Sequence, residues 1–396
     1  MSLPTERRDG DLDRADVGLL SPVWVGTSAE TLTSDREVVE AMVAFEAALS
    51  SALAEHRLAP HVGGLDAGRV DVRSLARAAV SPGNPTVPLV AALRHPLPDG
   101  DEARWLHHGG TSQDLVDSAL MLVSSAVLRE TDTHLVAAAD GLAALVDEHR
   151  SVPCVARTLT QQAMPTTLGF RIASWLAGVL EAIEAVRSCR PLPVSLGGAV
   201  GTAAAYGAAG PAVVASVASE LGLVAPVISW HTRRTPVLAL ATALSAVGES
   251  CGRICADLLL MGQTEVGEAS DGSDGGSSAM AHKANPTRAV LVSAAVRQLP
   301  GLLATLAASG ASGSERPAGA WHAEWQPLRT MLRLAGASAE RTREVVQHMT
   351  FDTAAMQRNL ALLVAAVAEE PGWVDAQTAH VDVWIDRVLA RHQEVV

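Results

Sequence analysis

The residues from Gly272 to Pro286, G-S-D-G-G-S-S-A-M-A-H-K-A-N-P, combine side chains that can move protons or bind anions with a flexible backbone. Its three glycines permit backbone angles that other residues avoid. Lys283 is the only lysine among 30 basic residues, and a compact ammonium differs from a guanidinium in geometry and hydration. A flexible Gly/Ser linker, the alternative reading, has no use for a unique lysine. We therefore predict that this stretch serves a reaction.

Two helix starts in the sequence favour anion binding. Asn285-Pro286 has the pattern of an N-cap followed by proline at the first helical position. Thr111 and Asp114 have the spacing of a capping box, which places Thr111 and Ser112 at the mouth of a long helix. Free backbone N–H groups and the positive end of the helix dipole make such mouths suitable for carboxylates. The alternative is that Thr111 only caps the helix and that the preceding histidines, 107 and 108, are surface residues.

Four more polar stretches stand apart from the apolar helical patterns. They are R-T-L-T-Q-Q-A-M-P (157–165), L-G-G-A-V-G-T (196–202), W-H-T-R-R (230–234) and E-R-P…W-H-A-E-W (315–325). The glycine-rich stretch lacks the spacing and the preceding strand of a dinucleotide fingerprint. A chain of net charge −13 that binds an anion must concentrate cations locally, and Lys283, Arg157, Arg234 and Arg316 lie in or beside these motifs. Each stretch taken singly is also compatible with an ordinary loop or with surface packing.

Composition restricts the class of protein. The chain has 396 residues, of which 48% are apolar and 18% charged, as expected for a large buried core. The negative charge argues against nucleic-acid binding. No apolar run approaches the ~20 residues of a membrane span, and the first 16 residues lack the apolar core of a secretion signal. The four cysteines lack metal-ligand spacing. We expect a cytoplasmic protein without disulfide, metal or cofactor.

The elements that would position these motifs are long helices. An amphipathic helix with a capping box is expected at 34–56, followed by short helical pieces between 60 and 101. Longer helices are expected at 114–150, 165–189, 235–261, 287–310 (kinked at Pro300) and 321–350, and shorter ones after 353, the last ending at His392. The helix at 235–261 carries apolar residues at alternating steps of four and three, a coiled-coil seam. We predict an all-α fold with no strand of any length, divided into a small N-terminal unit (1–110), a central long-helix bundle (111–350) and a short C-terminal region (351–396).

The motifs together resemble a known family. G-S-S-A-M-A-H-K-A-N-P is similar to the G-S-S-x-M-P-x-K-x-N-P signature of the aspartase/fumarase superfamily. The stretches G-N-P-T-V-P-L-V, H-H-G-G-T-S-Q-D, R-T-L-T-Q-Q-A-M-P, L-G-G-A-V-G-T, W-H-T-R-R, Q-T-E-V-G-E and E-R…W-H-A-E-W resemble the 3-carboxy-cis,cis-muconate cycloisomerases within it. The likeness runs in order through roughly residues 35–360.

This resemblance implies a shortened aspartase/fumarase-like helical bundle that assembles as a homotetramer with shared active sites. It also implies closure of a tricarboxylate diene to γ-carboxymuconolactone, in protocatechuate catabolism. Ser277 would transfer the proton, with Lys283 as the second catalytic residue. The residues expected to bind substrate are His107, His108, Thr111, Ser112, Arg157, Gln161, Gln162, Arg234, Ser278, Met280, Asn285 and Arg316.

Three positions separate this chain from related patterns. Leu159 stands where the similar adenylosuccinate lyases carry histidine, which fits an anionic leaving group that needs no general acid. Ala281 and Ala284 replace the proline and arginine of the M-P-x-K-R-N-P form, which removes one cation. Two alternatives stay open. One is a superfamily lyase acting on a succinyl-type substrate, and the other is a catalytically silent helical tetramer.

Overall fold

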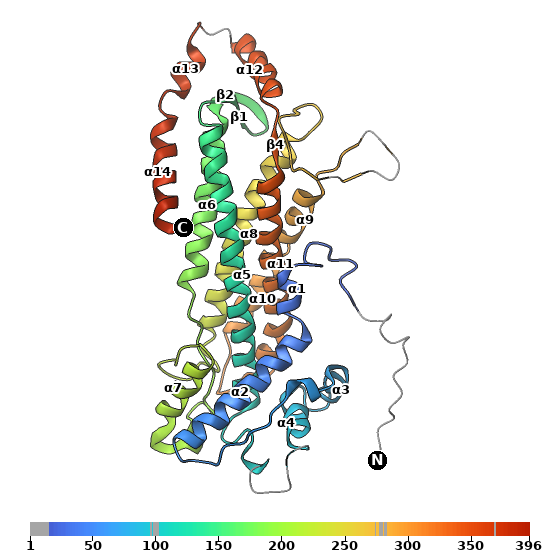
Figure 1. Cartoon of the computed structure of the whole chain (residues 1–396), viewed down its shortest axis with the longest axis vertical. Helices are drawn as coiled ribbons and strands as arrows, with labels where there is room; N and C mark the ends of the chain where they lie inside the picture. The colour runs from blue at the N-terminus through green and yellow to red at the C-terminus, as the bar shows by residue number, and fades with distance from the viewer. Residues whose placement is uncertain are drawn as a thin grey trace.

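Four long helices run side by side through the molecule in a computed structural model of the chain (Figure 1). The structure describes residues 16–95, 97, 103–273, 275–276, 280, 283–367 and 370–396. The four bundle helices are α5 (Ser112–Glu148), α6 (Leu168–Ser188), α8 (Thr235–Met261) and α11 (Ala320–His348). This confirms the all-α architecture, and four of the five predicted long helices lie within a few residues of their expected bounds.

The apolar seam of α8 explains why this helix is in the core. The residues predicted to form it are each at most 4% exposed: Leu240, Leu244, Val247, Cys251, Ile254, Leu258 and Met261. By length and composition alone, α8 and the stretch Thr287–Gly310 could each cross a membrane, so the expectation that no such run exists was wrong. Of their most apolar windows, 56% is buried for α8 but only 28% for Thr287–Gly310. The first is therefore a core helix, whereas the second leaves apolar surface exposed.

The predicted helix at 287–310 is two helices, α9 (Thr287–Val296) and α10 (Leu299–Gly310), with Pro300 in the first turn of the second. Small residues of α8 let both approach closely. A Cβ built at Gly248 would lie 2.2 Å from a methyl of Leu299, and one built at Gly252 would lie 2.9 Å from a methyl of Val296. The expected kink is thus a full break between packed helices.

A second group of helices lies at the end of the bundle where α5 begins (Figure 1). These are α2 (Asp35–Glu55), α3 (Val72–Ala78), α4 (Thr86–Arg94) and α7 (Gly210–Glu220), with short 3-10 turns at Ala67–Arg69, Ala103–Trp105 and Ala204–Ala209. The short helix α1 (Ser28–Leu32) packs farther along the bundle, against α5 and α11. The predicted cap of α2 is present, since the Ser34 hydroxyl accepts the Glu37 N–H at 3.2 Å.

A β-hairpin stands at the opposite end, where no strand was expected. Strands β1 (Pro153–Thr158) and β2 (Gln161–Thr167) pair antiparallel across a two-residue turn. That turn is Leu159-Thr160, and both residues have positive φ (49° and 66°). Left-handed angles in such turns usually call for Asn or Gly, so the sequence carried no hairpin signal. The polar stretch 157–165 is therefore strand and turn rather than a loop, and Pro165 lies in β2 rather than in α6.

The C-terminal helices pack on the hairpin and then return along the bundle. They are α12 (Thr353–Val367), α13 (Trp373–Thr378) and α14 (Val381–Val395), so the last helix ends three residues later than expected. Val155 of β1 forms a small core with Leu360 and Leu363 of α12. A second strand pair joins β3 (Ala269–Ser270) to β4 (Thr350–Phe351). The division at 110 and 350 stays a prediction.

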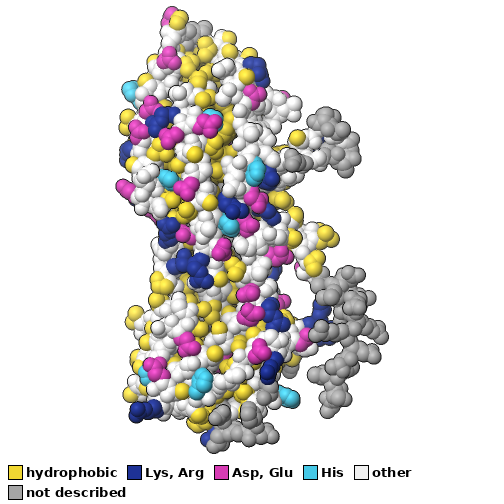
Figure 2. All heavy atoms as spheres, viewed as in Figure 1, with side chains coloured by type: hydrophobic (Ala, Val, Ile, Leu, Met, Phe, Trp, Pro, Cys, Tyr) yellow, Lys and Arg dark blue, Asp and Glu magenta, His cyan; other side chains and the backbone are white. Residues whose placement is uncertain are grey.

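Acidic and basic side chains are interspersed on the face of the molecule drawn in Figure 2, with apolar side chains between them. Several ion pairs on the surface hold α14 against α5 and α6, including Arg150–Asp386 at 2.7 Å and His392–Asp140 at 2.9 Å. Exposed pairs of this kind contribute little singly. Their number along one helix nevertheless fixes the C-terminal segment against the bundle.

Candidate active site

The mouth of α5 is the first place where predicted residues meet. Thr111 is its N-cap and Ser112 its first helical residue, and both are partly exposed. The capping-box contact is present, because the Thr111 N–H donates to Asp114 Oδ2 at 3.1 Å. The Thr111 hydroxyl also accepts a hydrogen bond from Arg316 Nη2 at 2.9 Å. An exposed guanidinium therefore stands directly at a helix mouth, an arrangement that favours a carboxylate.

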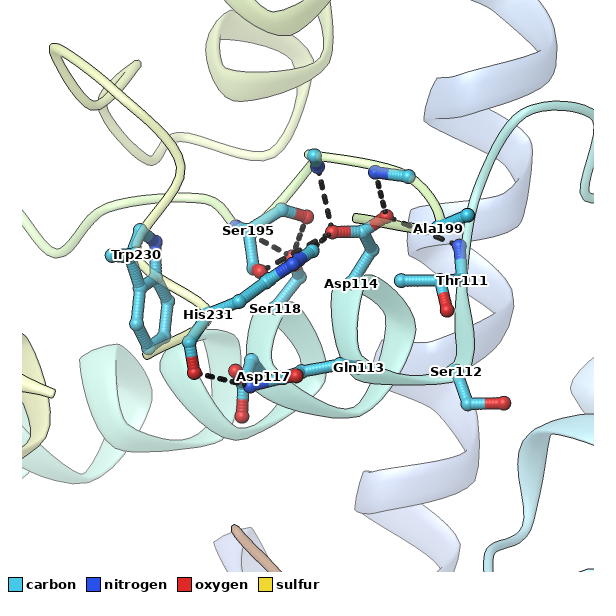
Figure 3. Close-up of polar contacts among 12 residues, drawn as sticks. Thr111, Ser112, Gln113, Asp114, Asp117, Ser118, Ser195, Ala199, Trp230 and His231 are labelled. Atoms are coloured by element: carbon cyan, nitrogen blue, oxygen red, sulfur yellow. Dashed lines mark hydrogen bonds and ion pairs between the residues drawn. The ribbon is translucent and has the colours of Figure 1, made fainter. Parts of the chain in front are cut away.

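The glycine-rich stretch 196–202 lies across this mouth and is held by the same carboxylate (Figure 3). The N–H groups of Gly197 and Gly198 donate to Asp114 at 2.7 and 2.8 Å. Glycine is required at both positions. A Cβ on Gly197 would lie 2.5 Å from Ser229 Oγ, and Gly198 has a φ of +70°. The carbonyl of Ala199, in the same loop, accepts from Arg316 Nη2 at 3.2 Å.

His231 approaches Asp114 from the other side. Its Nε2 lies 2.6 Å from Asp114 Oδ1, and Gln113 Nε2 donates to the His231 carbonyl at 2.7 Å. His231 is 3% exposed, and Asp114 is fully buried. His231 belongs to the polar stretch W-H-T-R-R, and the structure places it behind the mouth of the helix.

His107 and His108 lie in the turn that leads into α5. His107 has a φ of 62°, and its Nδ1 lies 2.5 Å from Glu46 Oε1. Burial alone would lower the pKa of His107, but the hydrogen bond and charge of Glu46 outweigh it and raise that pKa. His108 packs edge-on against Trp105, and its carbonyl accepts the Tyr206 hydroxyl at 3.2 Å. Both histidines are thus held near the mouth by buried partners.

Arg234 has a different position from the one expected of a substrate ligand. Its side chain is 3% exposed and lies between Asp117 at 2.7 Å and Glu324 at 2.5 Å, beneath the Trp230 ring. Burial raises the pKa of Glu324, and the neighbouring Asp117 adds to this against the pull of Arg234. The guanidinium forms ion pairs with two protein carboxylates. We therefore reassign Arg234 as a buried residue that links the starts of α5, α8 and α11.

The second group of predicted residues lies at the hairpin. Arg157 donates twice to Glu268, at 2.9 and 2.8 Å, and Asn359 Nδ2 donates to the same carboxylate at 2.7 Å. Burial alone would raise the pKa of Glu268, but these two hydrogen-bonding partners lower it. Gln161 and Gln162 are exposed at the start of β2. Arg157 also lines a pocket of about 280 Å³ with Arg171 and Arg253.

The loop that follows α8 is close to this hairpin end, since β3, just before the loop, directly follows Glu268. Ser277 and Ser278 lie outside the described residues. Met280, Lys283 and Asn285 are described, and Lys283 is exposed with no ion pair to a described carboxylate. Asn285 N–H donates to the Gly275 carbonyl at 2.6 Å, which closes the base of the loop.

Asn285 does not cap α9, contrary to the sequence prediction. The N-cap residue is Pro286, and the Asn285 carboxamide instead donates to the Gly276 carbonyl at 3.3 Å. The cap comes from Asp271, whose carboxylate accepts the Ala289 N–H at 3.0 Å. A cap from 18 residues upstream leaves no local sequence signal. Contacts between residues far apart in the sequence are also why the prediction missed the buried carboxylates that orient the cations and His107. These are Asp117, Glu324, Glu46 and Glu268.

The two groups do not meet within one chain. Thr111, Ser112, His107, His108 and Arg316 lie where α5 begins, and the hairpin follows directly after α5 ends (Figure 1). The helix has 37 residues, so its ends are about 55 Å apart at 1.5 Å per residue. A single chain thus presents two separate parts of the predicted site.

Comparison with known proteins gives consistent matches. The family model described as Lyase matches residues 88–301. The chain is 39% identical to a nitrosuccinate lyase of Streptomyces davaonensis over 377 residues, covering 90% of this chain and 79% of that one. It is 36% identical to a 3-carboxy-cis,cis-muconate cycloisomerase of Bradyrhizobium diazoefficiens, covering 90% and 84%. The crystal structure of the 3-carboxy-cis,cis-muconate lactonizing enzyme of Pseudomonas putida aligns with a TM-score of 0.86 at 29% identity, over 96% of this chain and 99% of that chain.

Proposed function

Because this chain belongs to the lyase family, whose model matches more than half of it, and shares the fold of the muconate cycloisomerases, we propose that it converts 3-carboxy-cis,cis-muconate to γ-carboxymuconolactone. The observation that carries the proposal is the mouth of α5. There the Arg316 guanidinium contacts the Thr111 hydroxyl at the N-terminal end of the helix, and Ser112 is the next residue. A helix N-terminus with a guanidinium beside it favours a carboxylate, which supports the proposal.

The chemistry matches the residue types at the two ends. A carboxylate oxygen of the substrate forms a C–O bond to one alkene carbon, and the neighbouring carbon receives a proton that comes from solvent through the enzyme. The lactone therefore keeps every substrate atom and carries one added proton, which removes one negative charge. The developing negative charge is delocalised into an adjacent carboxylate and needs fixed positive dipoles and cations. Lys283 and the helix mouth supply such charge, and we assign the proton to Ser277. Hydrogen-bond donors and a nearby ammonium would stabilise a serine alkoxide, which water alone would not.

The residue type at position 159 favours a reaction in which the group that leaves or enters the substrate is an anion. Leu159 lies at the tip of the hairpin and is 96% exposed in the single chain. A carboxylate, with a reference pKa near ~4, enters or leaves without protonation, whereas an amine needs a general acid. A leucine between Arg157 and Gln161 offers no such acid. The residue types therefore favour lactone formation over C–N cleavage that releases an amine.

A second function fits the same geometry, with a dicarboxylate as its substrate. Of the four cations predicted near the motifs, Arg157 and Arg234 are paired with buried carboxylates, which leaves Lys283 and Arg316 for substrate. Two cations match the two carboxylates of nitrosuccinate, the substrate in the name of the Streptomyces davaonensis relative. Removal of a proton beside one carboxylate and departure of nitrite would leave fumarate. Nitrite, like a carboxylate, is a stable anion that needs no acid at Leu159.

We further propose a cytoplasmic homotetramer in which one copy's α5 mouth meets another copy's hairpin and loop. The 55 Å between the two groups requires a second chain to complete the site. The apolar surface of α9 and α10 supplies a contact face, with a groove of about 440 Å³ against α8 lined by residues such as Val296, Leu299 and Leu303.

Assays of three substrates test the proposal. The wild-type enzyme is incubated with 3-carboxymuconate, nitrosuccinate and adenylosuccinate, and loss of diene absorbance, release of nitrite and formation of AMP are followed separately. The proposal predicts turnover of the muconate and its loss in Ser277→Ala. Nitrite release without muconate turnover would establish the second function instead. Cleavage of adenylosuccinate alone would contradict both.

A further inference from the structure

We propose that His231 is a positioning residue that, acting through Asp114, holds the substrate-binding mouth of α5 in its working geometry. The inference depends on the proposed function only in placing a substrate carboxylate at that mouth. His231 itself is 3% exposed and lies behind the mouth, so it acts on substrate through other groups rather than by contact.

Asp114 is the point where three separate segments meet. Its carboxylate accepts from Thr111 N–H at the start of α5, from two glycine N–H groups of the 196–202 loop and from His231 Nε2 (Figure 3). A weaker contact at 3.4 Å comes from Ser195 Oγ. A buried carboxylate with this many donors is a strong anchor, because charged hydrogen bonds are roughly twice as strong as neutral ones. Loss of one donor leaves charge that burial makes costly.

The anchor reaches the substrate position through Arg316. This guanidinium donates both to the Thr111 hydroxyl and to the Ala199 carbonyl. The first partner belongs to the helix start and the second to the glycine loop, so the direction of Arg316 depends on the register between the two segments. Asp114 sets that register, and His231 orients the Asp114 carboxylate.

The hydrogen bond to Asp114 determines the tautomer of the His231 ring. Nε2 must carry the proton, because an ionised carboxylate only accepts. Among the described residues, the buried Nδ1 has no hydrogen-bond partner, and Ser229 Oγ, close to the same glycines, has none either. Gln113 Nε2 donates to the His231 carbonyl and so holds the backbone from which the ring extends toward Asp114. The side chain is thus specialised for a single donation to Asp114.

Two variants separate donation from packing. His231→Gln keeps an N–H donor about as far from the backbone as Nε2, whereas His231→Phe keeps a ring of similar size and removes the donor. Val127→Ala, on the buried side of α5 away from the mouth, is the control for general loss of stability. The readouts are calorimetric affinity for tricarballylate, a non-reacting tricarboxylate, and hydrogen exchange of peptides covering 109–116 and 195–202.

The proposal predicts that His231→Phe weakens tricarballylate binding by about tenfold or more and speeds exchange in both peptides. His231→Gln and Val127→Ala should stay within about threefold of wild type. Unchanged affinity in His231→Phe would overturn the proposal, as would equal losses in the Phe and Gln variants. Because neither readout needs turnover, failure of the muconate assay would leave this result interpretable.

Discussion

At the scale of single residues, the site is organised by buried carboxylates whose distant partners could not be identified from the sequence. Asp114, Asp117, Glu46 and Glu268 each hold a cation, a histidine or backbone N–H groups that the sequence did mark. Arg234 shows the difference. Its place in W-H-T-R-R suggested a substrate ligand, but two carboxylates from α5 and α11 surround it. Residue type indicated where charge gathers, and only three-dimensional contact shows which charges are already neutralised.

The pair formed by His107 and Glu46 predicts a pH-dependent contribution to stability. The pKa of His107 is raised in the folded protein, so the contribution is full below the ordinary value near ~6.5 and is lost as pH rises through the raised value. We expect Glu46→Gln to be less stable than wild type by about 1.5–3 kcal/mol at pH 6. The difference should shrink towards pH 9.

Thermal melts of wild type and Glu46→Gln between pH 6 and 9 measure this. A gap between the two proteins that widens with pH would refute the assignment of a charged His107 in the pair. His107→Gln serves as the matched control, because glutamine cannot titrate. Its melting temperature, like that of Glu46→Gln, should depend on pH less than that of the wild type.

At the scale of elements, periodicity predicted the helices well. The apolar residues of α8, at alternating steps of four and three, predicted a helix from Thr235 to Met261, and the structure has these bounds. Features set by contacts between distant residues were not predictable. The cap of α9 comes from Asp271, before the loop, rather than from Asn285, next to the helix. The hairpin was missed because its turn is Leu159-Thr160, without the Asn or Gly that usually permits positive φ.

The turn of this hairpin carries strain that can be tested. Thr160 is β-branched and has a φ of 66°, a left-handed angle that costs a non-glycine residue about 1–2 kcal/mol. We expect Thr160→Gly to raise stability by about 1 kcal/mol. This net gain is smaller than the strain that is relieved, because glycine loses more entropy on folding. Denaturant melts measure the change, with Thr158→Gly in β1 as the control that should destabilise. A loss of stability in Thr160→Gly would contradict the strained turn.

At the scale of the whole molecule, a single chain separates two groups of residues that the reaction requires in one site. The α5 mouth and the hairpin lie at opposite ends of a 37-residue helix. The motifs could be recognised in sequence, but their separation could not, because distance along a bundle depends on which helices run antiparallel. An oligomer with shared sites resolves this, as symmetric contacts bring different ends of identical chains together.

Mixed oligomers test the shared site. Ser277→Ala and Thr111→Val should each be nearly inactive alone. When the two variants are unfolded together in equal amounts and refolded, about one quarter of sites should combine an intact Ser277 with an intact Thr111 from different copies. Activity should therefore return to about a quarter of wild type. Mass spectrometry confirms mixing, and verified mixed oligomers without activity would contradict shared sites.

The most direct test of the proposed reaction is isotope incorporation by the wild-type enzyme in D₂O. With 3-carboxy-cis,cis-muconate as substrate, the account predicts γ-carboxymuconolactone carrying one deuterium, on a single face of the carbon next to the new C–O bond. NMR of the product detects both the number and the face. A lactone without deuterium, with deuterium on both faces equally, or no lactone at all would contradict carboxylate addition with enzyme-directed proton transfer.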